Sequence, residues 1–237
     1  MPCYIHVFDE SPVQLWGLSS AQRIRREIEW ELSSLKGRLP GVATGQSIEF
    51  IDDLQYLPPE ADVVLLRGDY LYDVRVLTGL IAAADTLLQV EGEGGPVAVA
   101  AHTGAAAAAR VRDHISGNRQ ELPVILDIQS PNALVPQTNI RLKKAHAAFV
   151  LPITAANSRA LERHLFETAY KGITDLVTKW VWPTPARWVT RLCVRLGLLP
   201  NHVTALSWVL AILAGVLFYQ GALVAGLLSG WLMTFLD

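Results

Sequence analysis

A long stretch near the end of the sequence carries no charge. From Leu196 to Leu236 there is no Lys, Arg, Asp or Glu, and a helix of roughly 20 such residues crosses a hydrocarbon layer of about 30 Å. Residues 202–220 are long enough to cross once, residues 219–221 favour a reversal, and residues 222–236 would return. The apolar content of 51% is high for a soluble protein, and the excess lies in this part. We therefore expect two transmembrane helices within residues 199–237.

The acid that follows this stretch, Asp237, is a candidate functional residue. Ionisable side chains reached from inside a membrane are costly, and they are functional sites by default. Ala222, Gly226 and Gly230 recur every fourth residue, which would let another helix pack closely along this side. At about 3.6 residues per turn Asp237 shares that side, so we expect its carboxylate to face protein or a cavity. We also expect further sequence to follow it, because a last span that ends on an acid would be unusual.

The segment before the spans, residues 166–198, is predicted to contain an amphipathic helix. Arg187, Arg191 and Arg195 recur at every fourth position, and tryptophan and aliphatic residues occupy other sides. This pattern is typical of a helix that lies in a membrane interface; a soluble helix packed on the first domain is the alternative. Basic residues precede the first span and no signal peptide is recognisable, so we expect an integral inner-membrane protein with a cytoplasmic N-terminal domain.

Residues 1–165 are predicted to form one α/β domain, because short apolar runs alternate with helical patterns. The first helix begins near Ser20, where Ser19 and Gln22 have the spacing of a capping box. The net charge of −2, without any basic run, argues against nucleic acid as a partner, and two distant cysteines argue against a disulfide framework. The expected strands are 4–8, 48–51, 63–66, 97–100, 124–128 and 148–153; the expected helices are 20–36, 74–90, 105–109 and 155–169; residues 130–139 are expected to form a loop.

One candidate site in this domain is Asp69, close behind the apolar run 63–66. Open α/β sheets bind ligands beyond the carboxyl ends of their strands, where this acid would project. Arg67-Gly68-Asp69 resembles the strand end at which nucleotidyltransferases of the sugar-nucleotide type offer a metal-binding acid; a turn that uses Asp69 for local hydrogen bonds is the alternative. That family has a glycine-rich, basic loop after its first strand to cradle phosphate, whereas residues 9–18 contain one glycine and two acids. We expect a degenerate domain that keeps the fold without the reaction.

The C-terminal part resembles the beginning of a CDP-alcohol phosphatidyltransferase. The run Leu199-Pro200-Asn201-His202-Val203-Thr204 is similar to the Pro-Asn-x-x-Thr that opens the first transmembrane helix of that family. Phe235-Leu236-Asp237 stands where its signature Asp-x-x-Asp-Gly-x-x-Ala-Arg begins. Lys171 and Asp175 resemble the fused members that carry a nucleotidyltransferase-like domain in front, such as bifunctional inositol-phosphate cytidylyltransferase and di-myo-inositol phosphate phosphate synthase. The resemblance covers nearly the whole chain.

This resemblance implies a membrane enzyme of phospholipid or polar-lipid synthesis. Such enzymes transfer a phosphatidyl-type group from a CDP-linked lipid to an alcohol acceptor and release CMP. Their aspartates hold Mg²⁺ or Mn²⁺, and Asp237 matches the first of them; a later aspartate takes the proton of the acceptor. Pro200, Asn201 and Thr204 match positions near the CDP moiety. The remaining acids would follow Asp237, so the chain alone is expected to be inactive, and the family also implies contact with membrane lipids and a possible homodimer.

Two other functions stay open. One is a membrane-tethered nucleotidyltransferase that acts on a sugar or alditol phosphate, with its metal at Asp69. The other is a non-catalytic, membrane-anchored binding protein. Nucleotide binding by residues 1–165, and the effect of replacing Asp237, separate the three.

Overall fold

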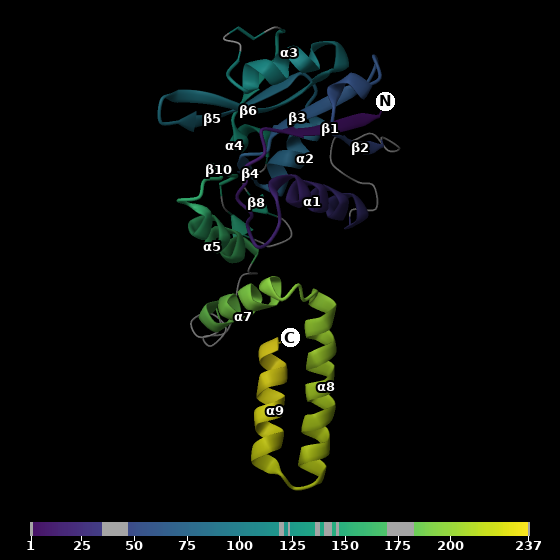
Figure 1. Ribbon diagram of the computed structural model, residues 1–237, viewed down its shortest axis with the longest axis vertical. Helices are drawn as coiled ribbons and strands as arrows, with labels where there is room; N and C mark the ends of the chain where they lie inside the picture. The colour runs from purple at the N-terminus through teal and green to yellow at the C-terminus, as the bar shows by residue number, and fades with distance from the viewer. Residues whose placement is uncertain are drawn as a thin grey trace. The chain divides into compact units, whose positions relative to one another are not determined.

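The computed structural model describes residues 2–34, 47–118, 121–122, 124–135, 138–139, 144–145, 147–169 and 183–236. The chain divides into two compact units, Met1–Lys171 and Gly172–Asp237. The first unit is a mixed α/β structure built on a six-stranded sheet, and the second is helical in its described part (Figure 1).

The sheet of the first unit has the strand order β2-β1-β3-β6-β5-β7. β1 pairs in parallel with β2 and with β3, whereas β6 runs antiparallel to both β3 and β5, and β7 pairs in parallel with β5. The carboxyl ends of β1, β2 and β3 therefore meet at one edge of the sheet. The strands are β1 Cys3–Phe8, β2 Ile48–Ile51, β3 Asp62–Arg67, β5 Thr86–Gly92, β6 Gly95–Gly104 and β7 Asp127–Gln129.

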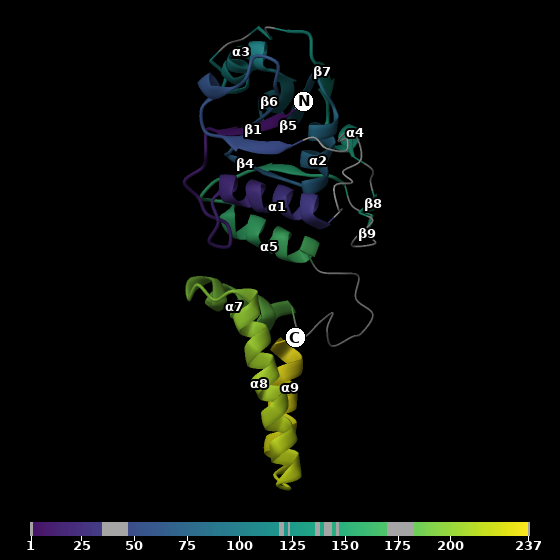
Figure 2. The same ribbon diagram turned by 90° about the vertical axis from the view of Figure 1, so that its right-hand side faces the viewer.

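Helices cover both faces of this sheet (Figure 2). Side chains alternate along a strand, so the buried Val64 and Leu66 of β3 join the core under α1 and α2, whereas Val63 and Leu65 join the core under α3. A third, smaller core packs α5 against β4, which pairs antiparallel with β10. These elements are α1 Ser20–Ser34, η1 Leu54–Tyr56, β4 Tyr70–Tyr72, α2 Val74–Ala82, α3 Ala105–Ile115, α4 Pro131–Leu134, β8 Thr138–Asn139, β9 Lys144–Ala145, β10 Val150–Pro152 and α5 Ser158–Ala169.

The predicted start of the first helix is confirmed. α1 begins at Ser20, and the capping box forms, because Gln22 N donates to Ser19 Oγ at 3.3 Å and Ser19 N donates to Gln22 Oε1 at 3.2 Å. The prediction of a mixed α/β unit is confirmed as well. The helix predicted from Ala105 also exists, and it continues to Ile115.

The helix predicted over residues 74–90 is wrong in its second half. α2 ends at Ala82, Asp85 takes a positive φ of 51°, and Thr86–Gly92 forms β5. The apolar run at Leu87 and Leu88 suits a helix or a buried strand equally well, and pairing with β6 and β7 decides for the strand. The partner strand predicted over 97–100 spans Gly95–Gly104 and is antiparallel. The loop expected over residues 130–139 likewise contains the short helix α4 and the strand β8.

The described part of the second unit contains α7 Pro183–Arg195, α8 Pro200–Tyr219 and α9 Leu223–Leu236. α8 has 20 residues, and it is the one described helix that is long and apolar enough to cross a membrane by length and composition. α9 is apolar but has 14 residues, about 21 Å. The described residues therefore show one of the two expected spans. The predicted reversal is confirmed at Gly221, whose φ is +79°.

α8 and α9 pack as an antiparallel hairpin through small residues. Ser229 Oγ donates to Leu210 O at 3.0 Å, and a Cβ on Gly226 would lie 2.8 Å from the Phe218 ring. Gly226 thus lies on the side that contacts α8, whereas a Cβ on Gly230 would meet open space among the described residues, so the expected close approach of another helix at Gly230 stays a prediction. Ser229 follows Gly226 by three residues, so both lie on the side of α9 that contacts α8. Asp237 lies outside the described residues.

Candidate functional sites

The acid predicted at the end of β3 lies at the carboxyl edge of the sheet, but it is already paired. Arg67 Nε donates to Asp69 Oδ1 at 2.9 Å, and Arg67 Nη2 donates to Asp69 Oδ2 at 2.5 Å. The guanidinium carbon also lies 5.1 Å from the centre of the Tyr70 ring. Burial would lower the pKa of Arg67, but the hydrogen bonds and the charge of Asp69 outweigh it and raise that pKa. Arg67 therefore stays charged and competes with any cation for this carboxylate.

No group of three or more His, Cys, Asp or Glu side chains that could hold a metal ion occurs among the residues that the structure describes. A metal ion at Asp69 would also have to displace Arg67 from the carboxylate. The backbone of Asp69 is fixed independently, because Ile153 N donates to Asp69 O at 2.7 Å. The alternative prediction, a turn in which Asp69 makes local hydrogen bonds, describes the observed geometry.

The loop after β1 places a carboxylate of the protein, that of Glu10, at the N-terminus of α1. Glu10 Oε1 accepts a hydrogen bond from Ala21 N at 3.0 Å, in the first turn of α1. A helix N-terminus attracts anions, and here Glu10 takes the position that a phosphate would use. Gly68 faces the same loop, since a Cβ on it would lie 2.8 Å from Glu10 Cα, and Ser20 Oγ donates to Gly68 O. Gly68 is thus required for packing against this loop.

The C-terminal end of the same loop, at Leu15 and Trp16, is hydrogen-bonded to two helices. Trp16 N donates to Glu162 Oε1 at 3.2 Å, and Trp16 Nε1 donates to Glu162 O at 3.0 Å, which ties the loop to α5. Arg23 of α1 donates to Leu15 O. Trp16 itself has a positive φ of 51°, a conformation that costs about 1 kcal/mol or more for such a residue and persists only where contacts enforce it. The loop is held in one conformation at both ends.

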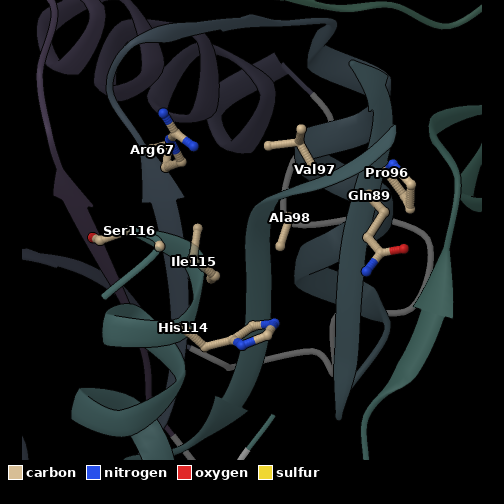
Figure 3. A pocket seen from close by; sticks show the side chains of 9 residues that line it. Arg67, Gln89, Pro96, Val97, Ala98, His114, Ile115 and Ser116 are labelled. Atoms are coloured by element: carbon tan, nitrogen blue, oxygen red, sulfur yellow. The ribbon is translucent and has the colours of Figure 1, made fainter. Parts of the chain in front are cut away.

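A shallow pocket of about 340 Å³ opens beside the end of β3. Figure 3 shows Arg67, Gln89 and His114 around this space, and they come from β3, β5 and α3. Its rim is fixed where Ser116 Oγ donates to Asp9 Oδ2 at 2.7 Å. The pocket has no signal in the sequence, because its residues lie far apart in the chain and Gln89 lies in the part of β5 for which the sequence predicts a helix. The other residues that line it are Pro96, Val97, Ala98, Ile115 and Gly117.

The residues predicted to lie near a CDP moiety form the first turn of α8. Pro200 is its first residue, Thr204 Oγ1 donates to Pro200 O at 3.2 Å, and Asn201 is exposed. The register of the hairpin is set by the Ser229–Leu210 hydrogen bond and by Ala222 N donating to Leu217 O. Continued to the end of α9, this register brings Leu236 level with Val203.

The predicted residues therefore form two sets. Pro200, Asn201 and Thr204 are together at one end of the hairpin, and Asp69 belongs to the other unit. A comparison with models of protein families finds no match, and a search of curated proteins finds no similar sequence. The function is therefore inferred from the residues of this chain.

Proposed function

We propose that this chain forms the amino-terminal part of a membrane phosphotransferase of polar-lipid synthesis, which transfers a phosphatidyl-type group from a CDP-linked lipid to an alcohol and releases CMP. The supporting observation is the hairpin register, which brings the end of α9 level with the turn that carries Asn201 and Thr204. A ligand held there would contact polar groups of both helices. The order of Pro200-Asn201-x-x-Thr204, hairpin and acid follows the resemblance described above.

In this proposal each part of the second unit has a role. Asn201 and Thr204 bind the nucleotide end of the substrate, and Asp237, which follows Leu236 in the sequence, contributes to a Mg²⁺ or Mn²⁺ site together with acids from later sequence. The metal would stabilise negative charge on the phosphate oxygens. α8 crosses the inner membrane, and α9 returns as a second membrane helix. The N-terminal unit lies in the cytoplasm.

The N-terminal unit is proposed to be non-catalytic. Its phosphate-binding position at α1 is occupied by Glu10, and its candidate metal ligand Asp69 is paired with Arg67. Nucleotidyl transfer would need the helix N-terminus to be free of Glu10 and the carboxylate of Asp69 to be free for a metal. Both carboxylates instead make hydrogen bonds within the fold.

The test measures CMP release from CDP-diacylglycerol in membranes that contain the product of the gene, including any codons after Asp237, with Mg²⁺ or Mn²⁺ and a panel of alcohols. Asp237→Asn should lower the rate at least roughly 100-fold, as loss of a group that stabilises the transition state does. Asn201→Ala should raise KM for the CDP-lipid. Asp69→Asn is the matched control and should leave the rate unchanged. Full activity of Asp237→Asn would contradict the proposal.

A membrane-tethered nucleotidyltransferase is the second candidate, because the pocket of about 340 Å³ lies beside Arg67 and Asp69 at the carboxyl edge of the sheet. This function predicts Mg²⁺-dependent release of pyrophosphate from CTP or another nucleoside triphosphate. It also predicts the reverse mutational pattern, with activity lost in Asp69→Asn and kept in Asp237→Asn. The two functions are thus separated by the same pair of variants.

A further inference from the structure

We infer that α7 lies on a membrane surface that contains anionic phospholipid, with an apolar stripe toward the acyl chains. The stripe consists of Trp188, Leu192 and Leu196, which recur at every fourth position and are 70%, 55% and 64% exposed. Large apolar side chains that are exposed in a row mark an interaction surface. Residues four apart share one side of a helix, so the three side chains can enter an apolar phase together.

Cationic side chains flank this stripe on one side. Arg187, Arg191 and Arg195 each precede one member of the stripe, which places them about 100° around the helix from it. At that angle a guanidinium reaches the phosphate level while the stripe lies below it, and a guanidinium binds phosphate through two hydrogen bonds. The charge favours anionic over zwitterionic lipid, by roughly 100-fold for three arginines together.

The chain itself keeps α7 close to a membrane. α7 ends in a turn at Gly197, where φ is +67° and Leu198 N donates to Cys193 O at 2.9 Å. Only residues 196–199 separate α7 from α8, a distance of at most roughly 14 Å when extended. Leu198 and Leu199 are 42% and 59% exposed and continue the apolar surface toward α8. The inference requires α8 to enter a membrane, and it is independent of the phosphotransferase reaction.

Spin labels on single cysteines test the inference, because the native cysteines allow a clean background. Cys3 is fully buried, and burial together with the charge of Asp62 raises the pKa of its thiol to about 12, so it does not react. Cys193→Ser removes the other thiol. Labels are then placed at Leu192 on the stripe and at Thr190, which is exposed on the opposite side of α7. A label at Ile212 of α8, 66% exposed, reports the membrane interior.

The full chain is reconstituted in phosphatidylcholine vesicles with or without phosphatidylglycerol, and collisions of each label with oxygen and with a water-soluble nickel chelate are compared. With phosphatidylglycerol, the label at 192 should show the high ratio of oxygen to chelate collisions found at 212, and the label at 190 a severalfold lower one. Without phosphatidylglycerol, or with all three arginines changed to Gln, the ratio at 192 should fall toward that at 190.

Equal ratios at 192 and 190, with 212 in lipid, would overturn the inference and leave the membrane position of α8 intact. A label at 192 that is shielded from both reagents would mean that protein covers the stripe, which also overturns it. A ratio at 192 that does not respond to phosphatidylglycerol would overturn the requirement for anionic lipid. A label at 212 that collides mainly with the chelate would overturn this inference and the proposed membrane location together.

Discussion

Glu27 of α1 should make the N-terminal unit less stable as the pH rises, and replacing it with Gln should remove this effect. The side chain is largely buried, and burial is the main reason that its pKa rises from 4.5 to about 7; the charge of Asp73 adds to the rise and Arg23 opposes it. The folded unit therefore keeps a proton on Glu27 at pH values where the unfolded chain has lost it. Between pH 4.5 and 7 the folded state binds more protons, so its stability falls as the pH rises and then levels off.

The magnitude follows from the difference between the two pKa values. The difference of roughly 2.5 between the two pKa values, at about 1.4 kcal/mol for each unit, corresponds to about 3.5 kcal/mol. We expect about 2 kcal/mol, because water reaches part of the side chain and Gln loses the attraction of Arg23. Glu27→Gln should thus be about 2 kcal/mol more stable than the native chain at pH 8 and equally stable at pH 4. Urea unfolding of the full chain in detergent, followed by far-ultraviolet circular dichroism across this range, measures the difference.

Two further points make this measurement decisive. His6, whose pKa is lowered mainly by burial, contributes stability that is lost as the pH falls, so only the difference between variant and native chain isolates Glu27. Glu29→Gln, at an exposed position of the same helix, is the matched control and should show no such difference. A stability difference for Glu27→Gln that stays the same from pH 4 to pH 8 would refute the reasoning, because a fixed difference has no proton linkage.

Three packing predictions follow from the contacts described above. Gly68→Ala should lower the free energy of unfolding by about 1–3 kcal/mol, because its Cβ would meet Glu10 Cα at 2.8 Å; urea unfolding at pH 7 measures this, and an unchanged midpoint contradicts the contact. Glu10→Ala should cost about 1 kcal/mol by uncapping α1, in the same assay, and a neutral result would remove Glu10 as a cap. Gly226→Leu should separate α8 from α9, because a side chain there meets Phe218; the distance between spin labels at 203 and 236 should increase, and an unchanged distance would refute the packing.

Local patterns predicted the parts of the fold that local physics determines. The start of α1 follows from a capping box that forms between neighbours in the sequence. α8 follows from a long uninterrupted run of apolar residues. The strand β5 could not be predicted in this way, because Leu87 and Leu88 fit two structures and only their pairing with distant strands decides. The glycines at 92, 94 and 95 did carry a signal for the hairpin between β5 and β6.

The candidate sites likewise contain features that neighbouring residues determine and features that only the folded chain determines. Asp69 could be placed at the end of a strand from its neighbours alone, and it does lie there. Its pairing with Arg67 was open, because both a metal ligand and a local ion pair suit an acid at a turn. The pocket at Gln89, His114 and Ser116 had no signal in sequence, since its residues are unremarkable singly and meet only when β5 and α3 fold beside β3.

The ion pair between Arg67 and Asp69 distinguishes the two candidate functions, because the Asp69 carboxylate cannot bind Arg67 and a metal ion in the same way at once. Its two hydrogen bonds hold the guanidinium beside the pocket, and a divalent cation would have to displace that guanidinium and then rely on other ligands. Hard cations require several oxygen ligands, and the described residues contain no group of three or more His, Cys, Asp or Glu side chains that could hold one. In the proposed phosphotransferase the metal would be held at Asp237 and would not compete with Arg67. The ion pair therefore argues against a metal site at Asp69.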